Sequence, residues 1–261
     1  MGEKTSENFA LVTGASRGLG RSIAMELSAR GIHTLLVGTR DTVQQVCDEI
    51  REKYQTHSYA YIADLSRREE VLALAEKINK EHSVSILVNN AGMGGTRTFV
   101  DAPTDYLERI IDLNVRGTVL LTHAILPNLL RQKRSYVLNI GSMAAHNPTG
   151  YKTIYPGSKS FVLSFSLGLR AELKDTPVSV SVCSPGAMAT NEEVSARIAR
   201  QGFWGRATLK DTDRIARQCV RQMLRGKRVI VINPIAYLLS KIVPDCIRIP
   251  LLTRIVRREI K

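Results

Sequence analysis

Residues 9–31 read FALVTGASRGLGRSIAMELSARG, and this stretch decides the fold of the chain. A short apolar run ends in a glycine-rich turn, and an amphipathic helical pattern follows the turn directly. A nearly continuous run of apolar residues is typical of a strand that is buried on both faces of a sheet. The glycines allow a tight turn and let backbone N–H groups approach a phosphate at the start of the helix. The stretch therefore predicts a strand–turn–helix unit with a phosphate site at the turn.

The alternation of short apolar runs and longer helical patterns continues along the chain. Strands are predicted at residues 9–14, 32–38, 58–64, 85–92, 135–142, 178–186 and 228–233. Alternation of this kind predicts right-handed βαβ units. We therefore expect an α/β protein with a single Rossmann-type, doubly wound parallel sheet of about seven strands flanked by helices. We assign residues 1–233 to this domain, catalytic site included, and residues 234–261 to a basic amphipathic C-terminal extension of it.

The net charge of the 261 residues is +13, and it is unevenly distributed. From Arg206 onward there are 14 cations and 4 acids, so 14 − 4 leaves +10 in the C-terminal quarter. Such a region can bind nucleic acid, anionic lipid or an acidic protein, or it can be a solvated face. The four cysteines are scattered without a CxxC pair, which argues against a zinc site or a disulfide framework. Because the charged start also lacks the pattern of a signal peptide, we expect a cytoplasmic protein.

Ligands of doubly wound sheets bind beyond the carboxyl ends of the strands, and unusual motifs follow the strands here. These motifs are TGASRGLG after the first strand, Asp64, NNAG at 89–92, Ser142 and SPG at 184–186. With YxxxK at 155–159 and PGxxxT at 185–190, their order resembles the short-chain dehydrogenase/reductase family over about residues 8–232. Residues 160–190 resemble its DltE-like branch, which is related to the hydroxysteroid dehydrogenases and long-chain 3-ketoacyl reductases.

The resemblance implies an oxidoreductase that interconverts a ketone and a secondary alcohol with a nicotinamide cofactor. The candidate cofactor-binding residues are Gly14, Ser16, Arg17, Gly18, Leu19, Gly20, Arg40, Asp64, Leu65, Asn90, Ala91, Gly92, Tyr155, Lys159, Pro185, Gly186, Met188 and Thr190. By the resemblance, Asp64 and Leu65 would hold the adenine edge, and residues 90–92 would pass under the adenosine ribose. Asn89 would instead tie neighbouring strands together. We predict no metal site.

The end of the second strand decides which nicotinamide cofactor is expected. Enzymes that use NAD usually carry a carboxylate there for the ribose hydroxyls, whereas this chain has Gly38, Thr39 and Arg40. Arg17 points at the same region in related enzymes, and two guanidiniums suit a 2′-phosphate. We therefore predict NADP(H). NAD is the less favoured alternative, because Asp41 could bind its ribose.

Tyr155 and Lys159 are four residues apart, so they share one face of a helix. Pro156 is tolerated only near a helix start, which places the pair in the first turns. Reduction of a carbonyl needs a proton donor opposite the hydride, and a nearby ammonium favours the phenolate of a tyrosine. By the resemblance, Tyr155 donates the proton, Lys159 tunes it, Ser142 binds the substrate oxygen, and Asn114 holds a water leading from Lys159 to solvent.

Residues 191–206, with Phe203 and Trp204, fall at the variable substrate lid of the family. An apolar lid suits a hydrophobic ketone of the lipid, acyl or steroid type, which we expect the enzyme to reduce. A carrier-protein-linked 3-oxoacyl reductase and a non-catalytic NADPH-sensing protein are the alternatives. Nucleic acid is not expected as a partner, since no nucleic-acid-binding motif is present. We expect a homo-oligomer, a dimer or a tetramer.

Beyond Asn233, apolar residues alternate with cations, and no apolar run reaches the roughly 20 residues of a membrane span. We expect this segment to contact an anionic lipid surface, which would make the protein a peripheral membrane protein; a subunit interface is the alternative. The apolar residues of the pattern are Ile235, Leu238, Leu239, Ile242, Val243, Ile249, Leu251, Leu252 and Ile255. The cations alongside them are Arg248, Arg254, Arg257, Arg258 and Lys261.

Overall fold

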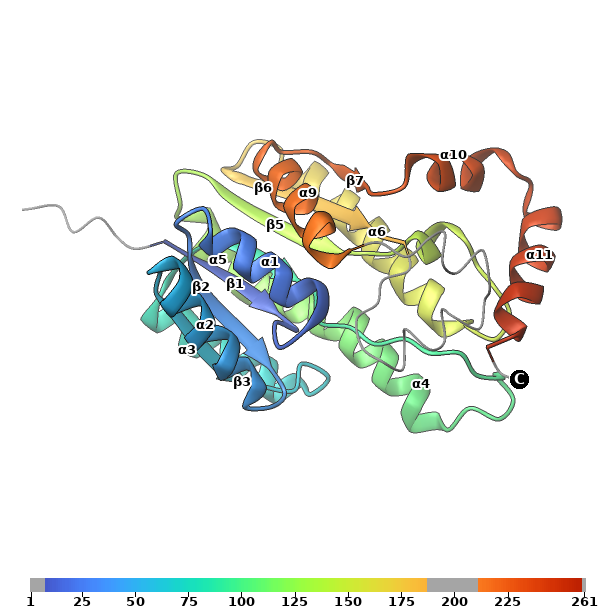
Figure 1. Cartoon of the computed structure of the whole chain (residues 1–261), viewed down its shortest axis with the longest axis horizontal. Coiled ribbons are helices and arrows are strands. Elements are labelled where there is room, and N and C mark those ends of the chain that lie inside the picture. The colour runs from blue at the N-terminus through green and yellow to red at the C-terminus, as the bar shows by residue number, and fades with distance from the viewer. Residues whose placement is uncertain (1–7, 187–210, 260–261) are drawn as a thin grey trace, which may run out of the picture.

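The computed structural model describes residues 8–186 and 211–259 of the chain (Figure 1). Its strands are β1 (Asn8–Thr13), β2 (His33–Gly38), β3 (Ser58–Ile62), β4 (Ser83–Asn89), β5 (Ser135–Ile140), β6 (Val178–Ser184) and β7 (Val229–Val231). Its helices are α1 (Gly18–Ser28), α2 (Thr42–Tyr54), α3 (Arg68–Glu81), α4 (Thr104–Ile111), α5 (Thr118–Leu130), α6 (Ile154–Glu172), α9 (Thr212–Leu224), α10 (Pro234–Ile242) and α11 (Asp245–Arg257). The π-helical turn η1 (Asp112–Gly117) and the 3₁₀ turn η2 (Met143–His146) complete the described elements.

The strands form one parallel sheet in the order β3-β2-β1-β4-β5-β6-β7. The predicted doubly wound fold is confirmed, and every predicted strand is present. Several of them end earlier than predicted; residues 90–92, for example, lie beyond β4. The reason is that these residues leave the ladder of hydrogen bonds to form the loops at the carboxyl edge of the sheet.

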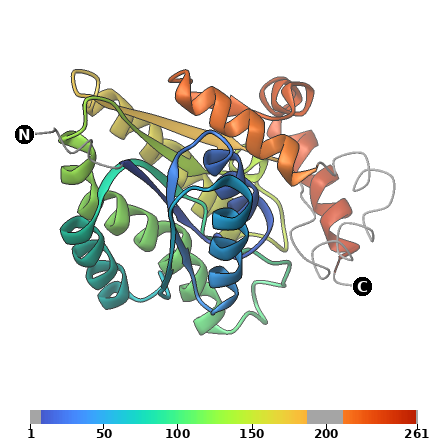
Figure 2. The same cartoon turned by 60° about the vertical axis from the view of Figure 1, so that its left-hand side comes forward.

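Helices cover both faces of the sheet (Figure 2), and the side chains of the central strands alternate between two hydrophobic cores. In β1, Ala10 and Val12 pack with residues of α1, α2 and α9, whereas Phe9 and Leu11 pack with residues of α3 and α5. This double burial explains why the strands read as continuous apolar runs. The loops that follow the strands at the carboxyl ends of the sheet are not covered in this way and can form a site.

A π-helical turn joins α4 to α5, so that the three elements run without a break from Thr104 to Leu130. The turn packs closely on the chain after β3, because a Cβ atom at Gly117 would clash with the carbonyl oxygen of Leu65. Single π-turns within α-helices are frequent at functional sites. This one carries the candidate residue Asn114.

All four cysteines are free thiols, and they differ in burial. Cys47, Cys183 and Cys219 are buried, whereas Cys246 is exposed on α11. The sulfur atoms of Cys183 in β6 and Cys219 in α9 lie 3.0 Å apart. Burial, together with the neighbouring Cys219, raises the pKa of the Cys183 thiol well above its usual value. Three of the four thiols are therefore shielded and one is open to solvent.

The last two described helices, α10 and α11, lie together at one end of the molecule in both views (Figures 1 and 2). Pro244 separates them, since α10 ends at Ile242 and α11 begins at Asp245. Within the described ranges, no helix combines the length and the hydropathy needed to cross a bilayer.

Candidate active site

The candidate residues gather at the carboxyl edge of the sheet, where four strands end side by side. Gly14 follows β1, residues 90–92 follow β4, Ser142 follows β5, and residues 185–186 follow β6. These four strands are neighbours in the order β1-β4-β5-β6. Met188 and Thr190, and the predicted lid at 191–206, lie outside the described residues.

The glycine loop after β1 has the geometry of a phosphate cradle. Gly14 and Gly18 have positive φ angles of 63° and 58°, which strain any other residue. A Cβ atom at Gly20 would lie 2.2 Å from the carbonyl oxygen of Gly14, so the helix approaches the turn more closely than a side chain permits. Arg17, at the N-cap of α1, makes no capping hydrogen bond, and the first turn holds no acid. The N–H groups at this helix start are thus suited to a pyrophosphate.

The glycine loop is fastened to the NNAG turn by hydrogen bonds. The side-chain amide of Asn90 donates to the carbonyl oxygens of Thr13, at 2.9 Å, and Gly14, at 3.1 Å. The Thr13 hydroxyl in turn accepts from the backbone N–H groups of Asn90 and Ala91, both at 3.0 Å. Asn90 therefore holds the two loops together through its side chain. Thr13 was missed by the sequence reasoning, although a hydroxyl directly before the first glycine was the available signal.

Asn89 has the structural role that was predicted for it. Its side-chain amide donates to the Thr122 hydroxyl and to the Asn139 side-chain oxygen, both at 2.8 Å and both buried. It thereby connects β4 with α5 and with β5. A buried amide paired in this way fixes the relative position of the strands that carry the site.

The side of the site expected to hold the adenosine contains one carboxylate that is already engaged. Asp64 accepts hydrogen bonds from Ser66 and from Arg109, the latter at 3.1 Å. Partial burial would raise the pKa of Asp64, but the Ser66 hydrogen bonds and the Arg109 charge outweigh it and lower the pKa. Asp64 is therefore ionised, and its hydrogen bonds to Ser66 and Arg109 hold its side chain in place. The side chains of Leu65 and Leu19 are buried in the core, so only their backbone atoms can serve a ligand.

The end of β2 lies beside the glycine loop. A Cβ atom at Gly38 would lie 2.4 Å from the Ser16 hydroxyl, so the two segments touch there. Arg17 and Arg40, which flank this contact in sequence, are exposed, and neither side chain bonds to another residue of the described chain. Asp41 has a helical backbone at the N-cap of α2 and makes no capping hydrogen bond. The arrangement presents two unpaired guanidiniums and one carboxylate at this corner.

Lys159 is the most unusual ionisable group of the site. Its side chain is 6% exposed, and its Nζ atom donates to the carbonyl oxygen of Ile140 at 2.8 Å. Burial penalises the ammonium and lowers the pKa of Lys159 to about 8. A buried lysine with a lowered pKa at the edge of a parallel sheet is typical of a catalytic group.

Asn114 and Lys159 converge beneath Gly92. A Cβ atom at Gly92 would lie 3.1 Å from the side-chain oxygen of Asn114 and 3.3 Å from Lys159 Nζ. The amide of Asn114 donates to the carbonyl oxygen of Met93 at 2.8 Å and to the Ser158 hydroxyl at 2.9 Å. The π-turn thus supplies a fully buried asparagine that links the NNAG turn to the start of α6. The residue pattern did not predict the π-turn itself.

Tyr155 is the second residue of α6, which begins at Ile154 as Pro156 predicted. Its ring lies under Gly94, where a Cβ atom would come within 2.6 Å of it. Ser142 has extended backbone, and its hydroxyl accepts from the N–H group of Ala144 at 3.1 Å. No described residue accepts the proton of that hydroxyl, which leaves it able to donate to a ligand. The SPG turn lies against the loop after β5, since the Pro185 carbonyl oxygen accepts a hydrogen bond from the N–H group of Met143 at 2.8 Å.

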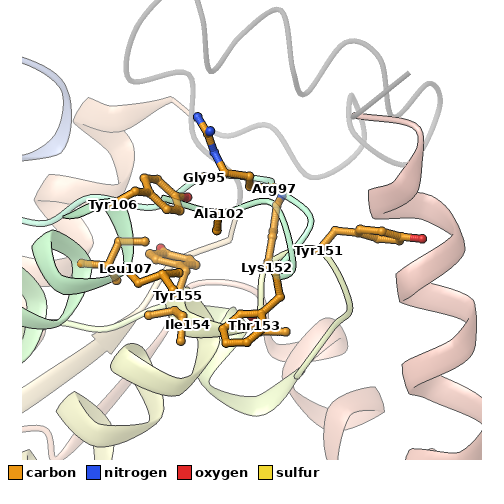
Figure 3. A pocket seen from close by; sticks show the side chains of 12 residues that line it. Gly95, Arg97, Ala102, Tyr106, Leu107, Tyr151, Lys152, Thr153, Ile154 and Tyr155 are labelled. Carbon is orange, nitrogen blue, oxygen red and sulfur yellow. The ribbon is translucent and has the colours of Figure 1, made fainter. Parts of the chain in front are cut away.

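A shallow pocket opens beside Tyr155 (Figure 3). Figure 3 shows Tyr106, Ala102 and Leu107 on one side of it and residues 151–155 on the other. The two sides are tied together by the N–H group of Arg97, which donates to the carbonyl oxygen of Tyr151 at 2.7 Å. The Arg97 guanidinium lies over the Tyr106 ring, 5.0 Å from its centre. The pocket is a concave surface next to the proposed proton donor.

Glu259 joins the two loops that border this pocket, and the sequence reasoning did not find it. Its carboxylate, 1% exposed, forms an ion pair with Lys152 at 2.7 Å and accepts a hydrogen bond from the Thr96 hydroxyl. Thr96 lies in the loop after the NNAG turn, and Lys152 lies three residues before Tyr155. The signal available was a lone acid at the end of a basic segment. Only the folded chain shows which cation it meets.

We expect Glu259→Gln to lower the free energy of unfolding by about 1–2 kcal/mol, because the partly buried Lys152 ammonium loses its counter-charge. The Michaelis constant should rise more than kcat falls, since the loops border the pocket and the ion pair touches no reacting group. Urea unfolding and steady-state kinetics measure the two effects. Glu52→Gln, a matched change on the exposed face of α2, is the control. Equal behaviour of the two variants would show that Glu259 does not hold the loops.

Comparisons with known proteins agree with this architecture. A family model described as short chain dehydrogenase matches residues 8–201. An uncharacterised oxidoreductase of Staphylococcus saprophyticus is 34% identical over 186 residues, which cover 70% of this chain and 80% of that protein. A very-long-chain 3-oxoacyl-CoA reductase of Anas platyrhynchos is 33% identical over 200 residues, which cover 75% of this chain and 63% of the reductase.

Among solved structures, a short-chain dehydrogenase from Sphingobium yanoikuyae in complex with NADPH superimposes with a TM-score of 0.76. It is 26% identical in sequence, and the match covers 94% of this chain and 95% of that chain. The likeness to a very-long-chain 3-oxoacyl-CoA reductase confirms the predicted resemblance to the ketoacyl reductase branch.

Proposed function

The chain belongs to the short-chain dehydrogenase family of oxidoreductases, and we propose that it uses NADPH to reduce a ketone on a hydrophobic substrate to a secondary alcohol. The observation that carries the proposal is the buried Lys159, which lies with Asn114 beneath the NNAG turn. The same turn is bonded to the glycine loop through Asn90. Lys159, which tunes the proton donor in this proposal, and the candidate phosphate cradle are thus linked through the same turn.

The residues present fit a dinucleotide cofactor. The cradle at Gly14 and Gly20 excludes side chains, and the start of α1 has neither a capping side chain nor an acid to compete with a phosphate. Arg17 and Arg40 would bind a 2′-phosphate, which favours NADP(H) over NAD(H). The similar Sphingobium yanoikuyae enzyme binds NADPH, which supports this choice. When bound, the cofactor supplies the hydride for the reduction.

Four side chains divide the remaining chemistry in this proposal. Ser142 donates a hydrogen bond to the substrate carbonyl oxygen and orients it. Tyr155 gives its proton to that oxygen as it becomes an alcohol oxygen, and takes the proton back in the reverse reaction. The Lys159 ammonium favours the phenolate form of Tyr155 after the transfer, and Asn114 holds the loops around Lys159 in place.

The pocket beside Tyr155 supports a hydrophobic substrate. Eight of its twelve lining residues are apolar or aromatic: Phe99, Ala102, Tyr106, Leu107, Ile110, Tyr151, Ile154 and Tyr155. Pockets of this make-up bury the apolar part of a ligand and orient it with few polar groups. The name of the Anas platyrhynchos relative, a very-long-chain 3-oxoacyl-CoA reductase, supports a long-chain acyl ketone in particular.

The decisive experiment follows NADPH consumption with a panel of ketones. The panel contains a long-chain 3-oxoacyl-CoA, a steroid ketone, a sphingoid ketone, a short carrier-protein-linked 3-oxoacyl group and a small polar ketone as the control. We expect turnover with at least one long apolar ketone and little with the polar control. Preference for the carrier-linked substrate would favour the alternative reductase. Tight NADPH binding without any turnover would identify a sensor instead of an enzyme.

We expect Arg40→Asp to reverse the cofactor preference by lowering kcat/KM for NADPH about a hundredfold relative to NADH, because a carboxylate replaces one of two phosphate-binding guanidiniums. The wild-type enzyme should prefer NADPH. Arg68→Asp, an identical charge change on α3, is the control and should leave the ratio unchanged. Equal kcat/KM for both cofactors in the wild type would contradict the assignment and point to Asp41 as a ribose ligand.

A further inference from the structure

The two C-terminal helices expose an apolar surface that nothing in the described chain covers. Six large apolar side chains on α10 and α11 are between 53% and 74% exposed. They are Ile235, Leu238, Leu239, Ile242, Ile247 and Leu251. Single exposed apolar residues are common, but a group of this size on adjacent helices marks an interaction site. We call it the α10–α11 surface.

On α10 the exposed residues form one complete stripe along the helix. Ile235, Leu238, Leu239 and Ile242 have the spacing i, i+3, i+4, i+7, which places them on a single face. The opposite face packs on the domain. There the Tyr237 ring meets His146 edge-on at 5.1 Å between centres, and Ser240 is buried. The stripe therefore points away from the protein.

On α11 the outward face changes from apolar to cationic along the helix. Ile247, Leu251, Arg254 and Arg258 are exposed at the spacing i, i+4, i+7, i+11. The inward face packs on the domain through the buried Val256, and the Thr253 hydroxyl accepts from Gly150 N at 3.0 Å. The helix thus offers apolar contact and positive charge on the same side.

The charges around the surface are almost all positive. Lys241, Arg254, Arg257 and Arg258 are exposed. Residues 234–259 contain two acids, and neither offsets these cations: Glu259 is buried against Lys152, and Asp245 pairs with Arg248. Arg248 itself is 13% exposed and also donates to the Ser240 carbonyl oxygen. The expectation that Arg248 would face a lipid is therefore wrong, because its guanidinium is occupied by partners at the junction of α10 and α11.

We propose that the α10–α11 surface docks on an anionic lipid membrane, with the apolar stripe of α10 in the acyl boundary and the exposed cations of α11 among the headgroups. A second copy of the chain is the disfavoured occupant. A two-fold contact would bring together two surfaces of the same positive sign, and both acids of residues 234–259 are already paired within the chain. An anionic bilayer complements both the apolar and the charged parts.

The two helices that carry the α10–α11 surface pack with their opposite faces on a loop of the candidate active site. Tyr237 packs on His146 and Thr253 binds Gly150, and both partners belong to the loop between Ser142 and Tyr155. Figure 1 shows α10 and α11 flanking the end of the molecule where this loop lies. Membrane contact would therefore hold the substrate pocket near the surface from which an apolar ketone arrives.

The test is flotation of the purified full-length protein with vesicles, without substrate or cofactor. We expect binding to vesicles of phosphatidylglycerol and phosphatidylcholine at low salt, weaker binding at moderate salt, and none to phosphatidylcholine alone. Leu238→Ser with Leu239→Ser, and separately Arg254→Glu with Arg258→Glu, should each lower the bound fraction about tenfold. Arg68→Glu with Lys174→Glu makes the same charge change at exposed positions elsewhere and should not lower it.

Sedimentation velocity on the same variants separates the other occupants. Absence of wild-type binding to anionic vesicles at low salt would overturn the proposal. So would a Leu238→Ser, Leu239→Ser variant that binds vesicles normally but dissociates into smaller species, since the surface would then be a subunit interface. Binding that needs the arginines but not the leucines would also overturn it and indicate an acidic partner. Because no turnover is measured, these outcomes are independent of the proposed reductase activity.

Discussion

Tyr155→Phe is expected to lower kcat by about a thousandfold, because general acid catalysis by a positioned side chain contributes roughly 10²–10⁴. Phenylalanine keeps the ring beneath Gly94 and removes only the hydroxyl, so the start of α6 should fold as before. Binding of NADPH, measured by fluorescence titration, should change little. Loss of turnover with retained cofactor binding would place the missing group at the chemical step.

Tyr151→Phe is the matched control for this change. Tyr151 lines the same pocket and precedes Tyr155 by four residues, but no lysine follows it at the spacing of Lys159. We expect this variant to keep most of its turnover. If Tyr155→Phe retained a tenth of the wild-type kcat, or if both variants lost activity equally, Tyr155 would not be the main proton donor.

Lys159→Met is expected to lower kcat about a hundredfold, since the ammonium that favours the phenolate is lost. Methionine has a similar length and suits a buried position, so the fold should not suffer. The buried ammonium is in fact costly for the native state, and the variant should be at least as stable as the wild type at pH 7. Denaturant unfolding checks this. A loss of activity that merely followed a loss of stability would count against a catalytic role.

The pH dependence gives a second measure of the same residue. In the folded protein burial lowers the pKa of Lys159 from 10.5 to about 8. Between these values the unfolded chain holds a proton that the folded chain has released, so the cost of burying the ammonium is full below pH 8 and fades as the pH rises toward 10.5. The stability advantage of Lys159→Met should therefore shrink over this window. In the wild type, kcat/KM for NADPH should fall above about pH 8, as Lys159 loses its charge.

The fold could be predicted because the central strands are buried on both faces, and because helical patterns with a different period alternate with the strands. A short apolar run such as residues 32–38 is assigned to a buried strand when helical patterns flank it on both sides. The ends of the strands could not be predicted in the same way. NNAG continues the apolar run of β4 in sequence, but its backbone leaves the sheet to bond with Thr13. Composition does not show where a ladder of hydrogen bonds ends.

The site could be predicted only in part, because its motifs are local and its supports are not. Tyr155 and Lys159 are near in sequence, and their helical spacing was visible. Glu259 meets Lys152 across 107 residues, and Asn90 meets Gly14 across 76, so neither contact leaves a pattern in the chain. Asn114 was found by resemblance, but the π-turn that turns it inward was not. Such long-range partners follow from the packing of the whole domain.

The single exposed thiol described above makes the protein a natural subject for site-specific labelling. Cys246 lies in the first turn of α11, next to Ile247 on the α10–α11 surface, whereas burial keeps the other three sulfurs from a reagent. Burial also raises the pKa of Cys47 and Cys183, and a protonated thiol is a poor nucleophile. A maleimide dye would therefore attach at one position in the unmodified sequence. The emission of the dye would report the polarity around α11. The rate at which the three buried thiols react would measure how often unfolding exposes the core.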